Sequence, residues 1–157
     1  MSTGQGSSER AAAVERIRNI VAGSAVHGDP TTVLTGYLSH SDNLVRSSAL
    51  DAIQVAPGLE KLRAAQAVAH LANDPDPYYR AEAAKTLGIL GRPEATQTLI
   101  YLMANDPDEL VRADAAEALG YLGARDAVPA LLAALHDEHS MVRNDAAYAL
   151  GFVGAQR

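Results

Sequence analysis

The side chains best suited to binding charged groups recur at a regular interval along the sequence. Arginines come every 31 to 34 residues, at Arg46, Arg80, Arg112 and Arg143. A row of guanidinium groups could bind a run of anions, because each presents a fork of donors to a carboxylate or a phosphate. Aspartates also come four residues before the first three arginines, at Asp42, Asp76 and Asp108. We therefore expect a structural role, in which each arginine pairs with turn aspartates of its own or the adjacent repeat.

Positions two, five and nine residues after each arginine form a second recurring pattern. This spacing places the three positions on one side of a helix. Across the last three repeats the first position is acidic and the third is apolar. The residues expected to bind a partner are Glu82, Lys85, Ile89, Asp114, Glu117, Tyr121, Asp145, Tyr148 and Phe152. Aromatic anchors beside charges are typical of interface hot spots; the alternative is that the apolar row is covered by the neighbouring repeat and only packs.

A short His-Asp-Glu-His run offers ligand types suited to a divalent ion. His136 and His139 enclose Asp137 and Glu138 in this run. The run falls between two predicted helices, and no further ligand is fixed nearby. We expect a solvated turn here and no bound metal.

Motifs of known enzyme chemistries are missing from the sequence. There is no cysteine, which excludes disulfide scaffolds and cysteine nucleophiles. A phosphate-binding glycine loop, a nucleophile elbow and a His-Glu zinc motif are also missing. Asp114 and Glu117 are neighbouring carboxylates, but acid–base catalysis needs one of them in an apolar pocket that nothing in the sequence supplies. The sequence therefore predicts a protein that is not an enzyme and holds no cofactor.

The elements that position these side chains belong to an internal repeat. Residues 73–104 and 105–136 are identical at 14 of 32 positions. Alanine occurs 31 times and leucine 18 times in the 157 residues, whereas there are only six tyrosines and one phenylalanine. Because alanine and leucine favour helices, the composition predicts an all-α fold, and the short connections predict antiparallel helical hairpins.

Each repeat is expected to contain two helices. The first-type helices are predicted at 30–38, 58–72, 93–104 and 126–136. The second-type helices are predicted at 43–55, 76–90, 108–122 and 140–153, after an opening helix at 8–22. Aspartate N-caps are expected at Asp42, Asp76 and Asp108, and the helices are expected to end at Gly91, Gly123 and Gly154.

No repeat can bury its apolar face alone, so the repeats must stack. The sequence predicts a right-handed α-solenoid of about four and a half hairpins, with about nine helices. Residues 1–7 are expected to form a flexible tail, and residues 8–157 a single repeat domain. Its units are predicted near 8–28, 29–57, 58–91, 92–123 and 124–157.

The repeated pattern V/Y-R-x-x-A-A-x-x-L-G-x-L-G, followed by A-x-x-x-L, resembles the HEAT-like repeats of phycobilisome lyases and of many small bacterial and archaeal scaffold proteins. The resemblance extends over residues 39–157 and is strongest over 73–154. It implies that second-type helices line a concave surface and first-type helices a convex one. The consensus residues are those that pack one repeat on the next, so they indicate fold more than function.

Deoxyhypusine hydroxylase, a related HEAT-repeat enzyme, binds two irons through His-Glu pairs just after the repeat arginine. The matching pairs in this sequence are Ser47-Ser48, Ala81-Glu82, Ala113-Asp114 and Asn144-Asp145. None of them contains histidine. The resemblance therefore does not extend to the di-iron chemistry.

The charge of the chain is unevenly distributed. Nineteen acidic residues against 13 Lys and Arg give a net charge of −6, and residues 105–145 alone hold nine acidic residues and three arginines. This segment repels phosphates and attracts a basic segment. We expect a protein or peptide partner with a basic segment, and no nucleic acid. Without a signal sequence or a long apolar run, the sequence also predicts no membrane contact and a cytoplasmic location.

The C-terminal end lacks a polar closing helix. Leu150, Phe152 and Val153 come within a few residues of it. A partner or a second copy of the chain is expected to cover this end, so self-association there is a further prediction.

Three functions are compatible with these observations. The first is a non-enzymatic scaffold or adaptor that binds a protein or peptide on the concave face. The second, implied by the resemblance to the lyases, is a subunit that handles a bilin such as phycocyanobilin. The third is a structural subunit that associates through its C-terminal end.

Overall fold

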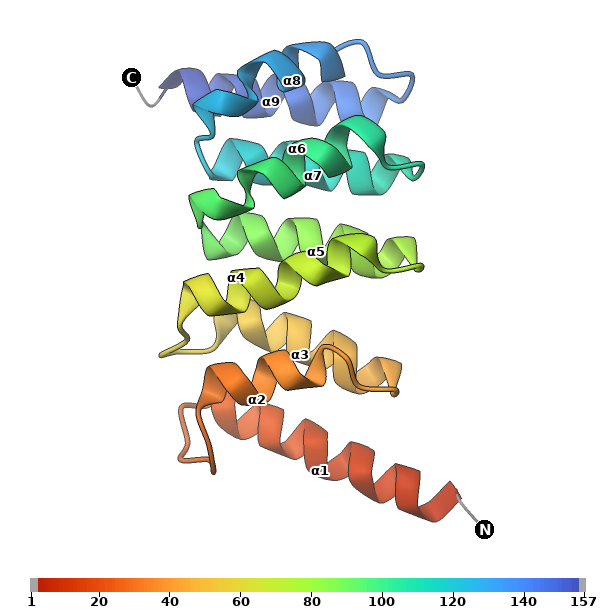
Figure 1. The fold of residues 1–157 in the computed structure, drawn as a ribbon, viewed down its shortest axis with the longest axis vertical. Helices are drawn as coiled ribbons and strands as arrows, with labels where there is room; N and C mark the ends of the chain where they lie inside the picture. Colours follow the sequence, from red (N-terminus) through yellow and green to blue (C-terminus); the bar gives the residue numbers. More distant parts are fainter. Residues whose placement is uncertain (1–2, 156–157) are drawn as a thin grey trace. The chain divides into compact units, whose positions relative to one another are not determined.

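The computed structural model describes residues 3–155 (Figure 1). Over that range every regular element is a helix, with nine α-helices and three short 3-10 helices. The predicted all-α fold is therefore confirmed. The chain forms two compact units, Met1–Ala67 and Val68–Arg157.

The first unit is built around one central helix. Its elements are α1 (Thr3–Val21), α2 (Pro30–Tyr37), α3 (Asn43–Val55) and most of α4 (Lys61–Ala69). Helix α3 packs against both α1 and α2. The buried side chains of this unit include Ile17, Leu34, Val45, Leu50 and Ile53.

The second unit has two layers of helices. Its elements are η1 (His70–Asn73), α5 (Pro77–Leu90), η2 (Pro93–Ala95), α6 (Thr96–Asn105), α7 (Glu109–Tyr121), η3 (Arg125–Ala127), α8 (Val128–Ala134) and α9 (Ser140–Ala155). Helices α5, α7 and α9 lie side by side in one layer, and α6 and α8 pack on them as the other (Figure 1). The core between the layers includes Leu87, Leu99, Val111, Leu119 and Leu131.

Aspartates begin the second-type helices. The carboxylate of Asp42 accepts hydrogen bonds from the Leu44 and Val45 backbone N–H groups. Asp76 and Asp108 cap α5 and α7 in the same way. These bonds satisfy N–H groups that have no partner within the helix, and they fix where each helix starts relative to its arginine.

Several predicted boundaries differ from the structure. Helix α1 begins at Thr3, so residues 3–7 of the predicted tail are helical; residues 1–2 of that tail lie outside the described residues. Glycine and serine weaken a helix without stopping it, and no proline interrupts this stretch. The helix predicted at 58–72 begins at Lys61 and ends as the 3-10 helix η1.

The expected glycine ends hold for two of the three helices. Gly91 and Gly123 follow α5 and α7 with left-handed φ values of 69° and 60°, which glycine adopts without strain. Gly154 instead lies inside α9, which continues to Ala155. Gly4 and Gly6 at the start of α1 and Gly154 near the end of α9 are thus helical.

Candidate functional site

The nine residues predicted to bind a partner lie on α5, α7 and α9, all within the second unit. Positions are counted here from the repeat arginine of each helix: Arg80 in α5, Arg112 in α7 and Arg143 in α9. We call the side chains at +2, +5 and +9 the binding face. All nine of them are exposed or partly exposed to solvent.

Asp114 lies at the centre of the binding face. Lys85 and Glu82 on α5, Glu117 on α7 and Asp145 on α9 all act on its charge. The pKa of Asp114 is raised to about 6, because burial and the three neighbouring carboxylates together outweigh the opposing charge of Lys85. Burial also raises the pKa of Asp145. Two carboxylates of the face are thus held in surroundings that disfavour their negative charge.

The one cation of the predicted face is already engaged within its own helix. Lys85 Nζ donates to Glu82 Oε1 at 2.8 Å. This hydrogen bond is the main reason that the pKa of Lys85 is raised. Lys85 therefore neutralises Glu82 more directly than Asp114, and the centre of the face stays acidic.

Aromatic side chains meet at the +5 and +9 end of the face. The Phe152 ring contacts the rings of Tyr121 and Tyr148, with centroids 6.1 and 5.3 Å apart. The Tyr121 hydroxyl donates to Glu117 Oε1 at 2.5 Å, and this bond raises the pKa of Tyr121 to about 12. Tyr148 remains 57% exposed. The three rings form a fixed group that still presents apolar area to solvent.

A further apolar row was missed by the sequence-based prediction. It lies two residues before each arginine, where Tyr78, Leu110 and Met141 are all exposed. This position is four residues before the acidic +2 position, so it falls on the same side of each helix. The signal was present in the sequence as an apolar residue two positions before each arginine, at Tyr78, Leu110 and Met141. We include this row in the binding face, which then has apolar side chains at both ends and carboxylates between them.

Arg80 and Arg112 each pair with an aspartate of the following repeat. Arg80 Nε and Nη2 donate to the two carboxylate oxygens of Asp106 at 2.8 and 3.1 Å. Arg112 makes the same pair of bonds to Asp137 at 2.9 and 3.1 Å. Arg112 is only 8% exposed, so this guanidinium is not offered to an external anion.

Arg46 and Arg143 each donate to backbone carbonyl groups. Arg46 Nε donates to the Leu38 carbonyl at 3.1 Å. Arg143 Nη1 donates to the carbonyls of Asp137 and Glu138 at 2.7 and 3.0 Å. All four arginines therefore hold the turn that precedes their own helix or one beside it.

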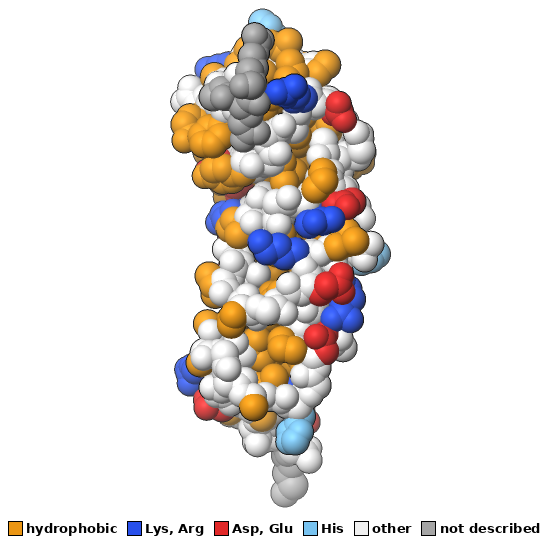
Figure 2. Space-filling model, turned by 90° about the vertical axis from the view of Figure 1, so that its left-hand side faces the viewer, with side chains coloured by type: hydrophobic (Ala, Val, Ile, Leu, Met, Phe, Trp, Pro, Cys, Tyr) orange, Lys and Arg blue, Asp and Glu red, His pale blue; other side chains and the backbone are white. Residues whose placement is uncertain are grey.

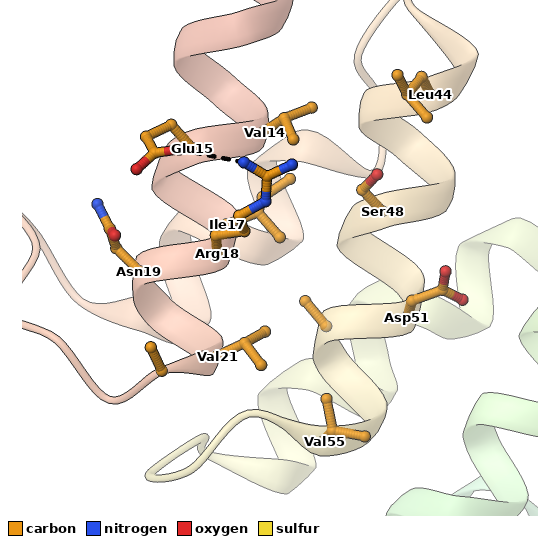
Figure 3. A pocket seen from close by; sticks show the side chains of 12 residues that line it. Val14, Glu15, Ile17, Arg18, Asn19, Val21, Leu44, Ser48, Asp51 and Val55 are labelled. Atoms are coloured by element: carbon orange, nitrogen blue, oxygen red, sulfur yellow. Dashed lines mark hydrogen bonds and ion pairs between the residues drawn. The ribbon is translucent and has the colours of Figure 1, made fainter.

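A hollow of the first unit lies between α1 and α3 (Figure 3). Its volume is about 850 Å³, and its lining is mostly apolar, including Val14, Val21 and Val55. Arg18 crosses one side and pairs with Glu15 at 3.4 Å. Sequence reasoning did not find this hollow, because it depends on how far apart two helices lie.

The His-Asp-Glu-His run forms the turn before α9. Asp137 is held by Arg112 and by the His139 backbone N–H, and both lower the pKa of its carboxyl. His139 Nε2 lies 3.6 Å from Glu138 Oε1. Among the described residues no group of three or more histidine and acidic side chains could hold a metal ion.

Charges of both signs are interspersed on the side of the molecule drawn in Figure 2. Basic and acidic side chains lie near one another there, with apolar side chains between them. No helix of residues 3–155 combines the length and apolar character that crossing a membrane requires.

Comparison with known families identifies the repeat. The family described as HEAT repeats matches residues 30–120 and 96–157. The chain belongs to the HEAT-repeat family. The matches cover both structural units, and they confirm the resemblance found in the repeated sequence pattern. A comparison with curated proteins gave no match.

Solved structures share the fold of this HEAT-repeat chain. The structure of human deoxyhypusine hydroxylase in complex with glycerol is 27% identical with a TM-score of 0.71, over 83% of this chain and 45% of that chain. The complex of CpcE and CpcF of phycocyanin lyase from Nostoc sp. PCC7120 is 22% identical with a TM-score of 0.65, over 81% and 79%. An engineered protein is 21% identical with a TM-score of 0.61, over 80% and 62%. The chain thus spans less than half of the human hydroxylase chain.

Proposed function

We propose that this HEAT-repeat chain is a non-enzymatic adaptor whose binding face, on α5, α7 and α9, holds a protein or peptide with a basic segment. The observation that carries the proposal is the layout of the face. Apolar side chains lie at both ends of it and carboxylates lie between them. A segment with Lys or Arg flanked by apolar residues matches this layout.

The aromatic group is the proposed anchor. Phe152 contacts both Tyr121 and Tyr148, so part of the conformational freedom of the three side chains is lost before a partner arrives. Exposed tyrosine and phenylalanine held in this way bury much area at little entropic cost. The HEAT-repeat fold, which presents its side chains from a stack of rigid helices, supports the same use.

The acidic centre is proposed to receive the partner's cation. Asp114 is partly desolvated and surrounded by three carboxylates, so a Lys or Arg of the partner gains a strong electrostatic attraction there. Such a cation lowers the pKa of Asp114 and releases its proton on binding. Binding is therefore expected to strengthen as the pH rises through about 6. The proposal keeps the cytoplasmic location expected from the sequence.

Selection from a random peptide-display library tests the proposal directly. The full chain is the bait, and a variant with Tyr121, Tyr148 and Phe152 changed to alanine is the counter-bait. The matched control is Tyr101→Ala, since Tyr101 is 64% exposed on α6, away from the face. The peptides enriched by the full chain are expected to carry Lys or Arg beside apolar residues.

The triple variant is expected to lose at least about thirtyfold in affinity for these peptides, which is the scale of a hot spot. The Tyr101→Ala control should bind as the unchanged chain does. Peptides that bind the triple variant equally well, or that lack basic residues, would overturn the proposed face.

A bilin-handling role is the alternative brought by the resemblance to the phycocyanin lyase. At 22% identity that likeness supports a common fold and no common activity. Phycocyanobilin added to the chain gives a separate test. A shifted and strengthened visible absorption band would favour the bilin role over the adaptor.

A further inference from the structure

The charges of the binding face are unevenly shared among its three helices. At +2 and +5, α5 carries Glu82 and Lys85, whose charges cancel. Helix α7 carries two carboxylates at the same positions, Asp114 and Glu117, and α9 carries one, Asp145. The face is therefore acidic over α7 and α9, and it holds its single cation on α5.

Lys85 is more exposed than the carboxylate that it binds. Its Nζ donates to Glu82 Oε1 at 2.8 Å, and the Lys85 side chain is 47% exposed whereas the Glu82 side chain is 16% exposed. A partner that approaches α5 thus meets the ammonium group before it meets the carboxylate. Because Glu82 takes only one of the three N–H donors of the ammonium, the others can bind an acceptor on the partner.

The cation on α5 and the acidic centre on α7 lie close enough to act on each other. Lys85 opposes the rise that burial causes in the pKa of Asp114. After the hydrogen bond to Glu82, the charge of Asp114 is among the causes that raise the pKa of Lys85. A Cβ added to Gly88 would lie 2.8 Å from the Ala118 Cβ, so α5 and α7 pack at the short end of the usual axial separations, about 8 Å. Two side chains of one partner segment can therefore reach both helices at once.

We infer that the partner segment carries an acidic residue beside its cation, and that Lys85 binds this acidic residue while the carboxylates of α7 and α9 bind the cation. The inference rests on the proposed function and adds a charge order to it. Along the stack, the partner presents an Asp or Glu over α5 and a Lys or Arg over α7. A carboxylate is the acceptor assigned to Lys85, because a hydrogen bond between two charged groups is stronger than one to a neutral acceptor.

The same lysine disfavours a partner with a continuous basic run. A Lys or Arg opposite Lys85 would bring two cations together, and a like-charge contact of this kind lowers affinity. Without Lys85, Glu82 would complete a row of carboxylates at +2 on all three helices, which suits a basic run. Lys85 thus determines which charges of a partner the α5 edge of the face accepts.

A charge exchange across the interface tests the inference. The probes are the peptides that the unchanged chain enriches from the display library, and versions of them in which the acidic residue beside the cation is changed to lysine. Each peptide is titrated against the unchanged chain and against Lys85→Glu at about pH 8, above the pKa of Asp114, which is about 6. The unchanged chain should bind the acidic peptide about tenfold more tightly than its lysine version, and Lys85→Glu should reverse this order.

The only other lysine of the chain provides the matched control. Lys61 is exposed at the start of α4 and does not belong to the binding face. Lys61→Glu makes the same change of net charge as Lys85→Glu, but it should shift the relative affinity of the two peptides by less than about twofold. A reversal of the order by Lys61→Glu would overturn the role of Lys85 and assign the preference to net charge.

The triple variant with Tyr121, Tyr148 and Phe152 changed to alanine separates this inference from the proposed function. Peptides that lose binding to the triple variant but lack an acidic residue would overturn the role of Lys85 and leave the binding face standing. An equal preference of the unchanged chain and Lys85→Glu for the acidic peptide would do the same. Peptides that bind the triple variant as tightly as the unchanged chain, or a library that yields no peptide, would overturn the face itself and the inference with it.

Discussion

Arg18 on α1 and Ala52 on α3 line the same hollow of the first unit (Figure 3). They occupy the repeat positions of Gly88 and Ala118, which lie in contact in the second unit. Arg18 is the +8 residue counted from Arg10, and Ala52 is the +6 residue counted from Arg46. A long side chain at +8 cannot be buried under a neighbouring helix as glycine can. The hollow between α1 and α3 therefore follows from the arginine that stands in place of a glycine.

Replacing this arginine by glycine is predicted to close the hollow. In Arg18→Gly, α1 can approach α3 as α5 approaches α7, and binding of an environment-sensitive apolar dye should fall. The substitution also costs about 1 kcal/mol of helix stability. Glu9→Gly is the control, because it carries the same helix cost at an exposed site outside the hollow. Equal dye binding by both variants would mean that another feature separates the helices.

The +8 glycines are predicted to respond in opposite directions to alanine. Gly88→Ala and Gly120→Ala force a methyl into atoms less than 3 Å away, and overpacking of this kind costs about 1–3 kcal/mol, partly offset by the better helix propensity of alanine. Gly151→Ala has open space and should stabilise α9 by about 0.5–1 kcal/mol. Thermal unfolding of the three variants checks the prediction, and three changes of the same sign would contradict it.

Much of the fold could be predicted from the sequence because the helix caps and the helical spacing of apolar residues recur in several repeats. The caps Asp42, Asp76 and Asp108 and the range of α3 fall at the predicted residues. The predicted start of α1 was wrong because the repeat pattern is weakest there. Glycine and serine do not determine the residue at which an exposed helix begins. The error at α4 arose because a 3-10 ending depends on packing and not on periodicity.

The candidate site was less accessible to sequence reasoning, for a different reason. Helical spacing alone groups Asp114 with Glu117 and Tyr148 with Phe152, but the contact of Phe152 with Tyr121 depends on how far apart α7 and α9 lie. The row that contains Leu110 was missed since its apolar residues follow the caps and resemble helix-packing residues.

The repeat arginines are predicted to differ in their effect on stability. Arg112→Gln leaves Asp137 without its guanidinium at a largely buried site, and breaking a buried ion pair in this way costs on the order of 3 kcal/mol. Arg143→Gln removes an exposed guanidinium whose hydrogen bonds to residues 3–155 are made to carbonyl groups, so a loss below about 1 kcal/mol is expected. Urea unfolding of both variants measures the difference. A loss for Arg143→Gln as large as that for Arg112→Gln would show that Arg143 already has a buried partner.

The last prediction concerns the pH dependence of stability at Asp114. Because the folded protein raises the pKa of this carboxyl from its ordinary value of 3.8 to about 6, the folded state holds its proton more tightly than the unfolded state. The contribution of Asp114 is therefore most favourable below about pH 4, and stability falls as the pH rises from about 4 to 6. Asp114→Asn removes this fall. Solvent screening at a half-exposed site limits the expected gain at pH 7 to about 1 kcal/mol.

Asp126→Asn is the control, since it removes one negative charge from an exposed site on η3. Unfolding followed at several pH values should show a gain for Asp114→Asn that disappears at low pH, and an equal gain for both variants would point instead to the net charge of the chain.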